Sequence, residues 1–222
     1  MSNKVTVAAI QMTYGLEEAC EKVREAASQG AQIILLPELF ENWYFCQEKS
    51  YENYHLATTL EENPAVREMQ TIARDFKVVI PVSYYERVGE TTFNTVAVID
   101  ADGTIMGQYR KTHIPDDHFY QEKFYFTPGN TGFKVWDTAY AKIGVGICWD
   151  QWFPESARCM ALQGAELLFS PPAIGSEPIL DCHSMPHRPR CMQAHAAANL
   201  MPLIAATRLG PDTLTTTDSH PP

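Results

Sequence analysis

Hydrophobic positions along the chain alternate between the two-residue period of a strand and the wider period of a helix. An alternating run over residues 5–11 precedes an amphipathic pattern over 16–28 and a continuous apolar run over 32–36. This order predicts a strand, a helix closed by Gly30 and a buried strand. Such alternation of strands and helices is typical of an α/β fold.

The middle of the chain is predicted to contain another helix and several strands. Asn63 and Pro64 suit the N-cap and first position of a helix that ends near Phe76. The turn sequence over residues 101–103 predicts a hairpin, so strand directions should be mixed. Strands are predicted over residues 78–83, 93–99, 104–109, 132–136, 142–147, 166–170 and 203–207.

Two segments break this regular pattern. Residues 112–130 are polar and aromatic without a sustained period, which predicts a long loop with one helical turn. Loops of this kind often line active sites. A helix should run from Pro154 to near Gly164, and Pro189 should break a helical pattern that extends to Leu200. A proline inside a helix costs about 3 kcal/mol.

Composition restricts the classes of protein that fit. With 222 residues, 45% of them hydrophobic, the chain predicts one domain over 1–208 and a disordered tail over 209–222. A net charge of -10 without a Lys/Arg cluster argues against nucleic-acid binding. Six cysteines are too few for a secreted disulfide scaffold, and no apolar run reaches membrane-spanning length. We therefore expect a cytoplasmic protein without a membrane partner.

Three residues with chemical potential follow predicted strands directly, namely Glu38, Lys111 and Cys148. The carboxyl ends of strands in α/β folds converge on one edge, so the three side chains are expected to meet. A thiol needs a nearby cation, base or helix N-terminus to react at neutral pH. Lys111 would supply the cation, Glu38 the base, and the helix after Cys148 the dipole.

Each residue alone also has a structural explanation. Cys148 would suit an inert core position and Lys111 a solvated strand end. Glu38 is harder to explain in this way, because a carboxylate after a buried strand is costly without a partner. Together the three residues favour a cysteine hydrolase.

The segments LLPELF, YRKTHIP and GVGICWDQWFPE, in this order, resemble the signature segments of the nitrilase superfamily of carbon-nitrogen hydrolases. The resemblance covers residues 4 to about 208. It implies a four-layer α-β-β-α sandwich that uses no cofactor or metal. It also implies roles for individual residues: Glu38 as general base, Lys111 as stabiliser of the tetrahedral intermediate, Cys148 as nucleophile, the Trp149 backbone N–H as an oxyanion donor and Glu122 as a second glutamate.

Longer runs, including HIPDDHFYQEKFYFTPGNTGFKVW, resemble the N-carbamoylputrescine amidohydrolases within that superfamily. The implied substrate is a small cationic carbamoyl compound, whose ammonium needs a carboxylate at the far end of the pocket. Glu177 is the first candidate, and Asp181 and Asp116 are the others. Trp43 and Tyr44 lie near Glu38 in sequence and would suit the wall of a narrow slot. Core packing explains either residue equally well.

The chain departs from the resemblance after Thr207, where relatives continue with strands and an arm that crosses to a partner subunit. We expect these C-terminal strands to be lacking. We also expect a homo-oligomer. Two other functions remain open for this chain. The first is that of a β-ureidopropionase or N-carbamoyl amino-acid hydrolase, whose substrates need Arg in the pocket. The second is that of an inactive truncated subunit that binds partners. A papain-like protease is a distant third, because its local sequence is absent.

Histidines and further cysteines outside these segments carry less weight. Those at 182, 183, 187 and 191 have spacings that suggest a metal site, but Pro186 and Pro189 disturb regular helical presentation, so no metal is predicted. His113 and His118 lie in the loop after Lys111, where packing or surface roles are favoured over proton transfer.

Overall fold

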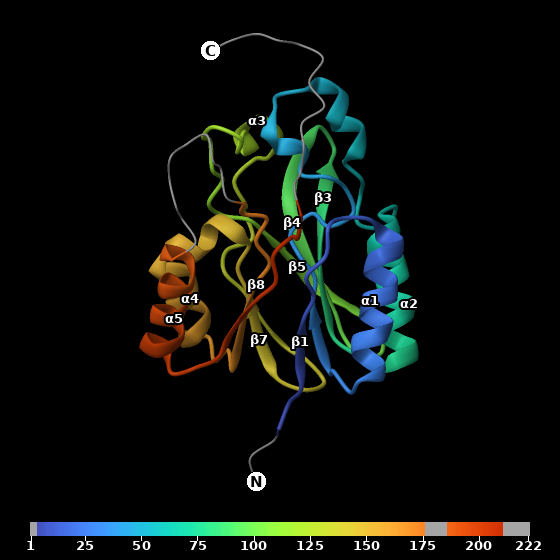
Figure 1. Ribbon diagram of the computed structural model, residues 1–222, viewed down its shortest axis with the longest axis vertical. Helices are drawn as coiled ribbons and strands as arrows, with labels where there is room; N and C mark the ends of the chain where they lie inside the picture. The colour runs from blue at the N-terminus through green and yellow to red at the C-terminus, as the bar shows by residue number, and fades with distance from the viewer. Residues whose placement is uncertain (1–3, 176–185, 211–222) are drawn as a thin grey trace.

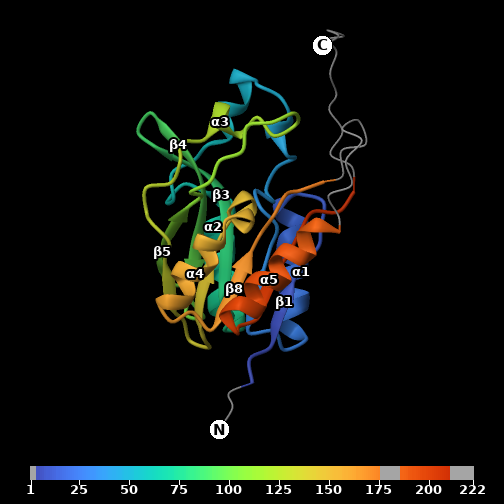
Figure 2. The ribbon, with the colours of Figure 1, turned by 90° about the vertical axis from the view of Figure 1, so that its left-hand side faces the viewer.

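The computed structural model describes residues 4–175 and 186–210. Two layers of β-strands lie at the centre, with α1 and α2 covering one outer face and α4 and α5 the other (Figure 1). Figure 2 shows the same layers after a quarter turn, with α4 and α5 towards the viewer. The predicted α-β-β-α sandwich is therefore confirmed. The predictions that the C-terminal strands are lacking and that a tail follows residue 208 stay predictions.

The helices and strands follow the order expected from the hydrophobic pattern. The helices are α1 (Leu16–Ser28), α2 (Pro64–Phe76), α3 (Glu122–Tyr125), α4 (Pro154–Leu162) and α5 (His187–Asn199). The strands are β1 (Val7–Ala9), β2 (Ile33–Leu35), β3 (Ile80–Val88), β4 (Thr91–Ile99), β5 (Ile105–Arg110), β6 (Val135–Asp137), β7 (Lys142–Val145), β8 (Leu167–Ser170) and β9 (Leu203–Ala205). Short 3₁₀ helices span Phe45–Gln47, Tyr51–Leu56 and Cys148–Trp152.

The first β-layer combines parallel and antiparallel pairing. β1 pairs with β2 in parallel, and Val79 continues the layer by hydrogen bonds to the backbone of Gln32 and Ile34. β3, β4 and β5 then form antiparallel pairs. The predicted end of the third strand at residue 83 is wrong, because β3 continues to Val88 and forms a second hairpin with β4. The polar residue Glu86 hides this continuation in the sequence, although its side chain is buried.

The second β-layer has the order β6-β7-β8-β9. β6 and β7 are antiparallel, while β7, β8 and β9 are parallel. Apolar side chains fill the space between the two layers, and a separate apolar core lies beneath α1 and α2. The core between the layers includes Leu35, Val98, Tyr109, Val145 and Phe169. The strand ends that carry the predicted functional residues are thereby held on packed elements.

Two helices show how local sequence signals work out in the structure. The Asn63 side chain accepts a hydrogen bond of 2.8 Å from Val66 N, which confirms it as the N-cap of α2. The expected break at Pro189 is wrong, because α5 begins at His187 and continues through Asn199. Pro189 therefore lies in the first turn, where a backbone N–H has no intrahelical acceptor to lose.

Candidate active site

Glu38, Lys111 and Cys148 follow β2, β5 and β7 and are almost completely buried. Lys111 Nζ donates hydrogen bonds to Glu38 Oε1 at 2.8 Å and to Glu122 Oε2 at 2.6 Å. Cys148 lies close enough for the charges of all three residues to act on its thiol. The structure thus brings together the four residues whose catalytic roles the sequence resemblance implied.

Donors on several elements fix the carboxylate of Glu38. Besides Lys111, Asn94 Nδ2 donates to Oε1 at 2.7 Å, and the backbone N–H of Ala173 donates to Oε2 at 2.9 Å. Three donors of this kind hold the carboxylate in one orientation. Asn94 was not predicted from the sequence, because its only signal is a polar side chain in the middle of β4.

Glu122 begins α3 and accepts hydrogen bonds from Lys111 and from the hydroxyl of Tyr44, the latter at 2.6 Å. Burial raises the pKa of Glu122 to about 7, against the opposing effect of Lys111. Burial also disfavours the charge of Lys111, but Glu122 and Glu38 outweigh it and raise the pKa of Lys111 well above its usual value. Lys111 is therefore a permanent cation, while Glu122 titrates near neutral pH.

Cys148 lies at a sharp turn between β7 and the 3₁₀ helix that it begins. Its φ of 42° is in the left-handed region, which is uncommon for a non-glycine residue and marks local strain. Burial and the charge of Glu38 raise the pKa of the thiol well above its usual value, and Lys111 only partly opposes them. Lys111 favours the thiolate as expected, but burial and Glu38 outweigh its effect, and α4 begins only at Pro154.

Asp150 anchors the turn that carries Cys148. Its Oδ2 accepts hydrogen bonds from Tyr109 Oη at 2.7 Å and Ile147 N at 2.9 Å, while Oδ1 accepts from His113 N and lies 2.7 Å from His113 Nδ1. The His113 ring stacks on Phe153 with ring centres 3.6 Å apart. His113 therefore packs against the turn, in agreement with the role favoured for it.

This architecture has counterparts among known proteins. Residues 6–219 match the family described as carbon-nitrogen hydrolase. The chain belongs to the carbon-nitrogen hydrolase family. Its relatives include an N-carbamoylputrescine amidase from Solanum tuberosum, 54% identical over 96% of this chain and 73% of the relative. A citrullinase from Francisella tularensis subsp. tularensis is 52% identical over 92% of this chain and 74% of the relative.

Solved structures confirm the nitrilase fold of this hydrolase. A carbon-nitrogen hydrolase from Helicobacter pylori G27 has a TM-score of 0.85 and 35% identity, covering 93% of this chain and 74% of that one. An amidase from Nesterenkonia sp. has a TM-score of 0.78 and 23% identity, covering 95% of this chain and 79% of that one, and shows likeness of the fold alone.

The substrate-binding residues predicted for the hydrolase have different locations. Tyr44 is buried beside Glu122, whereas Trp43 is 38% exposed. Trp149 is half-buried and packs edge-to-face on Trp152, with ring centres 6.3 Å apart. Glu177 and Asp181 lie outside the described residues. Asp116 is exposed in the loop after Lys111.

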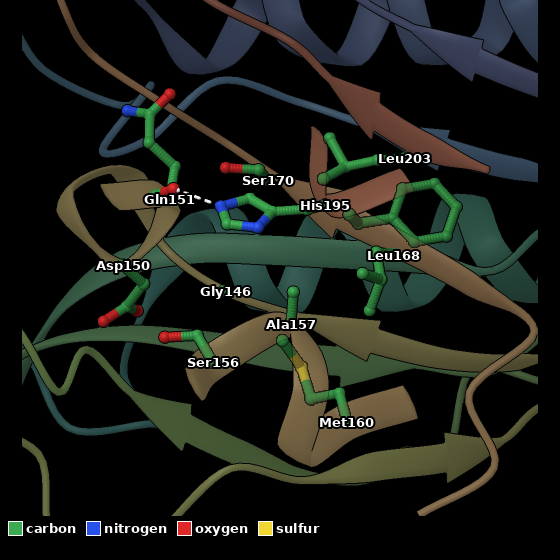
Figure 3. A pocket seen from close by; sticks show the side chains of 11 residues that line it. Gly146, Asp150, Gln151, Ser156, Ala157, Met160, Leu168, Ser170, His195 and Leu203 are labelled. Carbon is green, nitrogen blue, oxygen red and sulfur yellow. Dashed lines mark hydrogen bonds between the residues drawn. The ribbon is translucent and has the colours of Figure 1, made fainter. Parts of the chain in front are cut away.

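A small pocket of about 30 Å³ lies behind the turn of Cys148, among α4, β8 and α5 (Figure 3). Figure 3 shows the His195 ring in this pocket, where Nε2 lies 2.7 Å from Gln151 O. Its lining residues are Gly146, Asp150, Gln151, Ser156, Ala157, Met160, Leu168, Phe169, Ser170, His195 and Leu203. Glu38, Lys111 and Glu122 are not among these lining residues, so the pocket does not include the cluster that they form.

Within residues 4–175 and 186–210, no group of three or more His, Cys, Asp or Glu side chains is arranged to hold a metal ion. Cys182 and His183, which contributed to the spacing noted in the sequence, lie outside these ranges. In the same part of the chain, no helix is long and apolar enough to cross a membrane.

Proposed function

We propose that this hydrolase converts N-carbamoylputrescine to putrescine, ammonia and carbon dioxide, with Cys148 as the nucleophile. The observation that carries the proposal is the buried cluster of Glu38, Lys111 and Glu122 beside a thiol. The chain that holds this cluster is 52–55% identical to four plant N-carbamoylputrescine amidases.

In the proposed reaction, Glu38 takes the proton of Cys148 as the sulfur attacks the carbamoyl carbon. Lys111 Nζ and the backbone N–H of Trp149 stabilise the oxyanion of the tetrahedral intermediate. The bond to the putrescine nitrogen then breaks, and Glu38 returns the proton to this leaving group. A carbamoyl thioester remains on Cys148.

Water completes the cycle. Glu38 removes a proton from the water molecule as it attacks the thioester carbonyl, and Cys148 leaves as the thiol when the proton is returned. The carbamic acid released decomposes to ammonia and carbon dioxide. Glu38 thus serves twice as base and twice as acid, which agrees with the three donors that keep its carboxylate in one orientation.

The substrate's ammonium is proposed to pair with Glu177 or Asp181, and Trp43 and Tyr44 to border its alkyl chain. A homo-oligomer is proposed on the resemblance alone, and a cytoplasmic location on the cysteine content of the chain.

A second candidate substrate is citrulline, favoured by the citrullinase relative at 52% identity. Citrulline carries the same terminal carbamoyl group but adds an α-carboxylate. A pocket that binds citrulline would need a cation that pairs with this carboxylate. The two substrates therefore test the charge of the far end of the pocket.

Ammonia release from N-carbamoylputrescine, citrulline and N-carbamoyl-β-alanine tests the proposal. Wild type should prefer N-carbamoylputrescine, and Cys148→Ala should abolish turnover. Cys20→Ala is the matched control, because this thiol is also buried but lies in α1. Mass spectrometry of wild type quenched during turnover should detect the carbamoyl group on Cys148.

Three results would overturn parts of the proposal. Preference for citrulline or N-carbamoyl-β-alanine would reject the substrate. Full activity of Cys148→Ala would reject the nucleophile. No ammonia from any carbamoyl or amide substrate, together with co-purification of a longer homologue, would favour the non-catalytic subunit.

A further inference from the structure

The guanidinium of Arg208 binds three backbone carbonyl groups of the loop that carries Glu38. Its Nε and Nη2 atoms donate to Glu38 O at 3.3 and 3.2 Å, and Nη2 also donates to Leu39 O at 2.5 Å and Asn42 O at 2.8 Å. A planar guanidinium with several donors in fixed directions suits such converging carbonyl groups better than an ammonium does. Arg208 therefore holds the backbone at Glu38, Leu39 and Asn42.

This loop needs an external donor because it turns sharply after β2. Leu39 has a φ of 49°, a left-handed conformation that costs on the order of 1–2 kcal/mol for a residue with a side chain. Its N–H donates to Ser83 Oγ at 3.0 Å, so the turn is held by side chains on both sides. The carbonyl groups of Glu38 and Leu39 thus receive from Arg208 the hydrogen bonds that a neighbouring strand would supply elsewhere.

Arg208 approaches the loop from the other half of the sandwich. It follows β9, a strand of the second layer, and forms an isolated parallel bridge with Met12, which follows β1 of the first layer. Leu209 N strengthens this junction by donating to Met12 O at 2.8 Å. In Figure 1 the red segment after β9 rises beside the blue segment after β1. The arginine therefore links the two layers at the end of the sheet where the active site lies.

The same cation also lies near the ring of Tyr44, the residue that hydrogen-bonds to Glu122. Arg208 Cζ is 6.0 Å from the ring centre of Tyr44, whose hydroxyl donates to Glu122. This contact is at the outer limit of a cation–π interaction and contributes little by itself. Arg208 therefore lies against two residues that belong to or support the cluster, the backbone of Glu38 and the ring of Tyr44.

We propose that Arg208 is a positioning residue of the hydrolase, whose guanidinium sets the orientation of Glu38 relative to Cys148. The proposal rests on the proposed function of Glu38 as general base. Arg208 contacts the backbone of Glu38 and the ring of Tyr44, while the carboxylate of Glu38 remains bound by Asn94 and Lys111. Its loss should leave the catalytic groups present but misplaced.

Arg208→Ala and Arg208→Lys test this role, with Arg67→Ala on the exposed face of α2 as control. A displacement of about 1 Å in a catalytic group can lower the rate about 10²-fold. We expect kcat of Arg208→Ala to fall by about this factor and KM to change by less than about threefold, since the substrate contacts remain. Arg208→Lys should retain intermediate activity, because one ammonium cannot reproduce the planar set of N–H donors of the guanidinium.

Chemical rescue separates positioning from general stability. Guanidinium ion, at concentrations below those that unfold the protein, should restore part of the kcat of Arg208→Ala and leave Arg67→Ala unchanged. A merely structural defect would not be restored by this small cation, which fits only the space vacated by the side chain. Thermal unfolding of each variant shows how much folded protein is present in the assay.

Alkylation of Cys148 by iodoacetamide, followed by peptide mass spectrometry, supplies a readout that needs no substrate. If Glu38 is misplaced, alkylation of folded Arg208→Ala should be slower than that of wild type, and guanidinium should accelerate it. Absence of ammonia release from wild type would reject the proposed function, whereas this readout would still test the positioning role.

The role of Arg208 would be overturned if folded Arg208→Ala kept kcat within about threefold of wild type. It would also be overturned if activity fell only in proportion to unfolding, without rescue and with unchanged alkylation. Should Arg208→Ala fail to fold, Arg208→Lys decides between the same outcomes.

Discussion

Replacing Lys111 by methionine removes the cation that contacts both buried carboxylates while roughly preserving side-chain volume. Glu38 and Glu122 are 0% exposed and lie 2.8 and 2.6 Å from Nζ. Removing one partner of a buried ion pair destabilises a protein by about 3–5 kcal/mol, because the remaining charge has no compensation. We expect Lys111→Met to lose about this much stability at alkaline pH.

The loss should depend on pH in a direction fixed by Glu122. The pKa of this carboxyl is about 7 in the presence of Lys111, which lowers it, so it must rise further in the variant. Above pH 7 the native variant then retains a proton that native wild type releases, while both unfolded chains are ionised. Stability of the variant therefore falls faster as pH rises. Between pH 5.5 and 8.5 the difference grows by about 2 kcal/mol, at 1.36 kcal/mol per pH unit above 7.

Urea unfolding at pH 5.5, 7.0 and 8.5 measures this difference for wild type, Lys111→Met and the double variant Lys111→Met/Glu122→Gln. The double variant lacks the titrating carboxyl and should be less sensitive to pH than the single variant. Lys123→Met is the control, because this neighbouring lysine is exposed. An equal loss for Lys111→Met at pH 5.5 and 8.5 would refute the reasoning, as would a double variant that is no more stable than the single one at pH 8.5.

Two further substitutions test the supports of the cluster. A Cβ added at Gly129 would lie 2.0 Å from Arg110 O, so Gly129→Ala must displace the backbone that carries Lys111. We expect kcat of this variant to fall at least about 10-fold. The control is Gly146→Ala, whose added Cβ would make its nearest contact at an ordinary 3.5 Å and which should keep kcat within about threefold of wild type. Tyr44→Phe removes a hydrogen bond that lowers the pKa of Glu122, so the carboxyl titration of Glu122 followed by NMR should move above about 7, and an unchanged or lower pKa would contradict this account.

Local signals in the sequence account for the parts of the fold that were predicted well. The bounds of α1 and α2 follow from amphipathic spacing, with an Asn-Pro start for α2, and these features act within a few residues. Glu38, Lys111 and Cys148 could be placed together because each follows a predicted strand. The fold then determines that strand ends share one edge.

Contacts between distant segments could not be predicted in this way. Asn94 and Arg208 reach the Glu38 loop across 56 and 170 residues, and neither position has a local pattern that indicates its partner. The continuation of β3 was missed for a related reason. Glu86 looks like a solvent residue in the sequence, but Arg110 Nε pairs with its carboxylate at 2.7 Å across the sheet. Burial of a charge depends on its partner, which alternation along one strand does not indicate.

The raised pKa of the Cys148 thiol implies a particular order of charge movements in the proposed reaction. Before attack the thiol is neutral, Glu38 is the anion and Lys111 is the cation that binds it. When Glu38 takes the proton, its negative charge passes through the sulfur to the oxyanion of the tetrahedral intermediate. Lys111 then has a new anion to stabilise as its first one is neutralised. The net charge of the buried site stays constant through the step, so the low-dielectric surroundings that disfavour a free thiolate do not disfavour the attack.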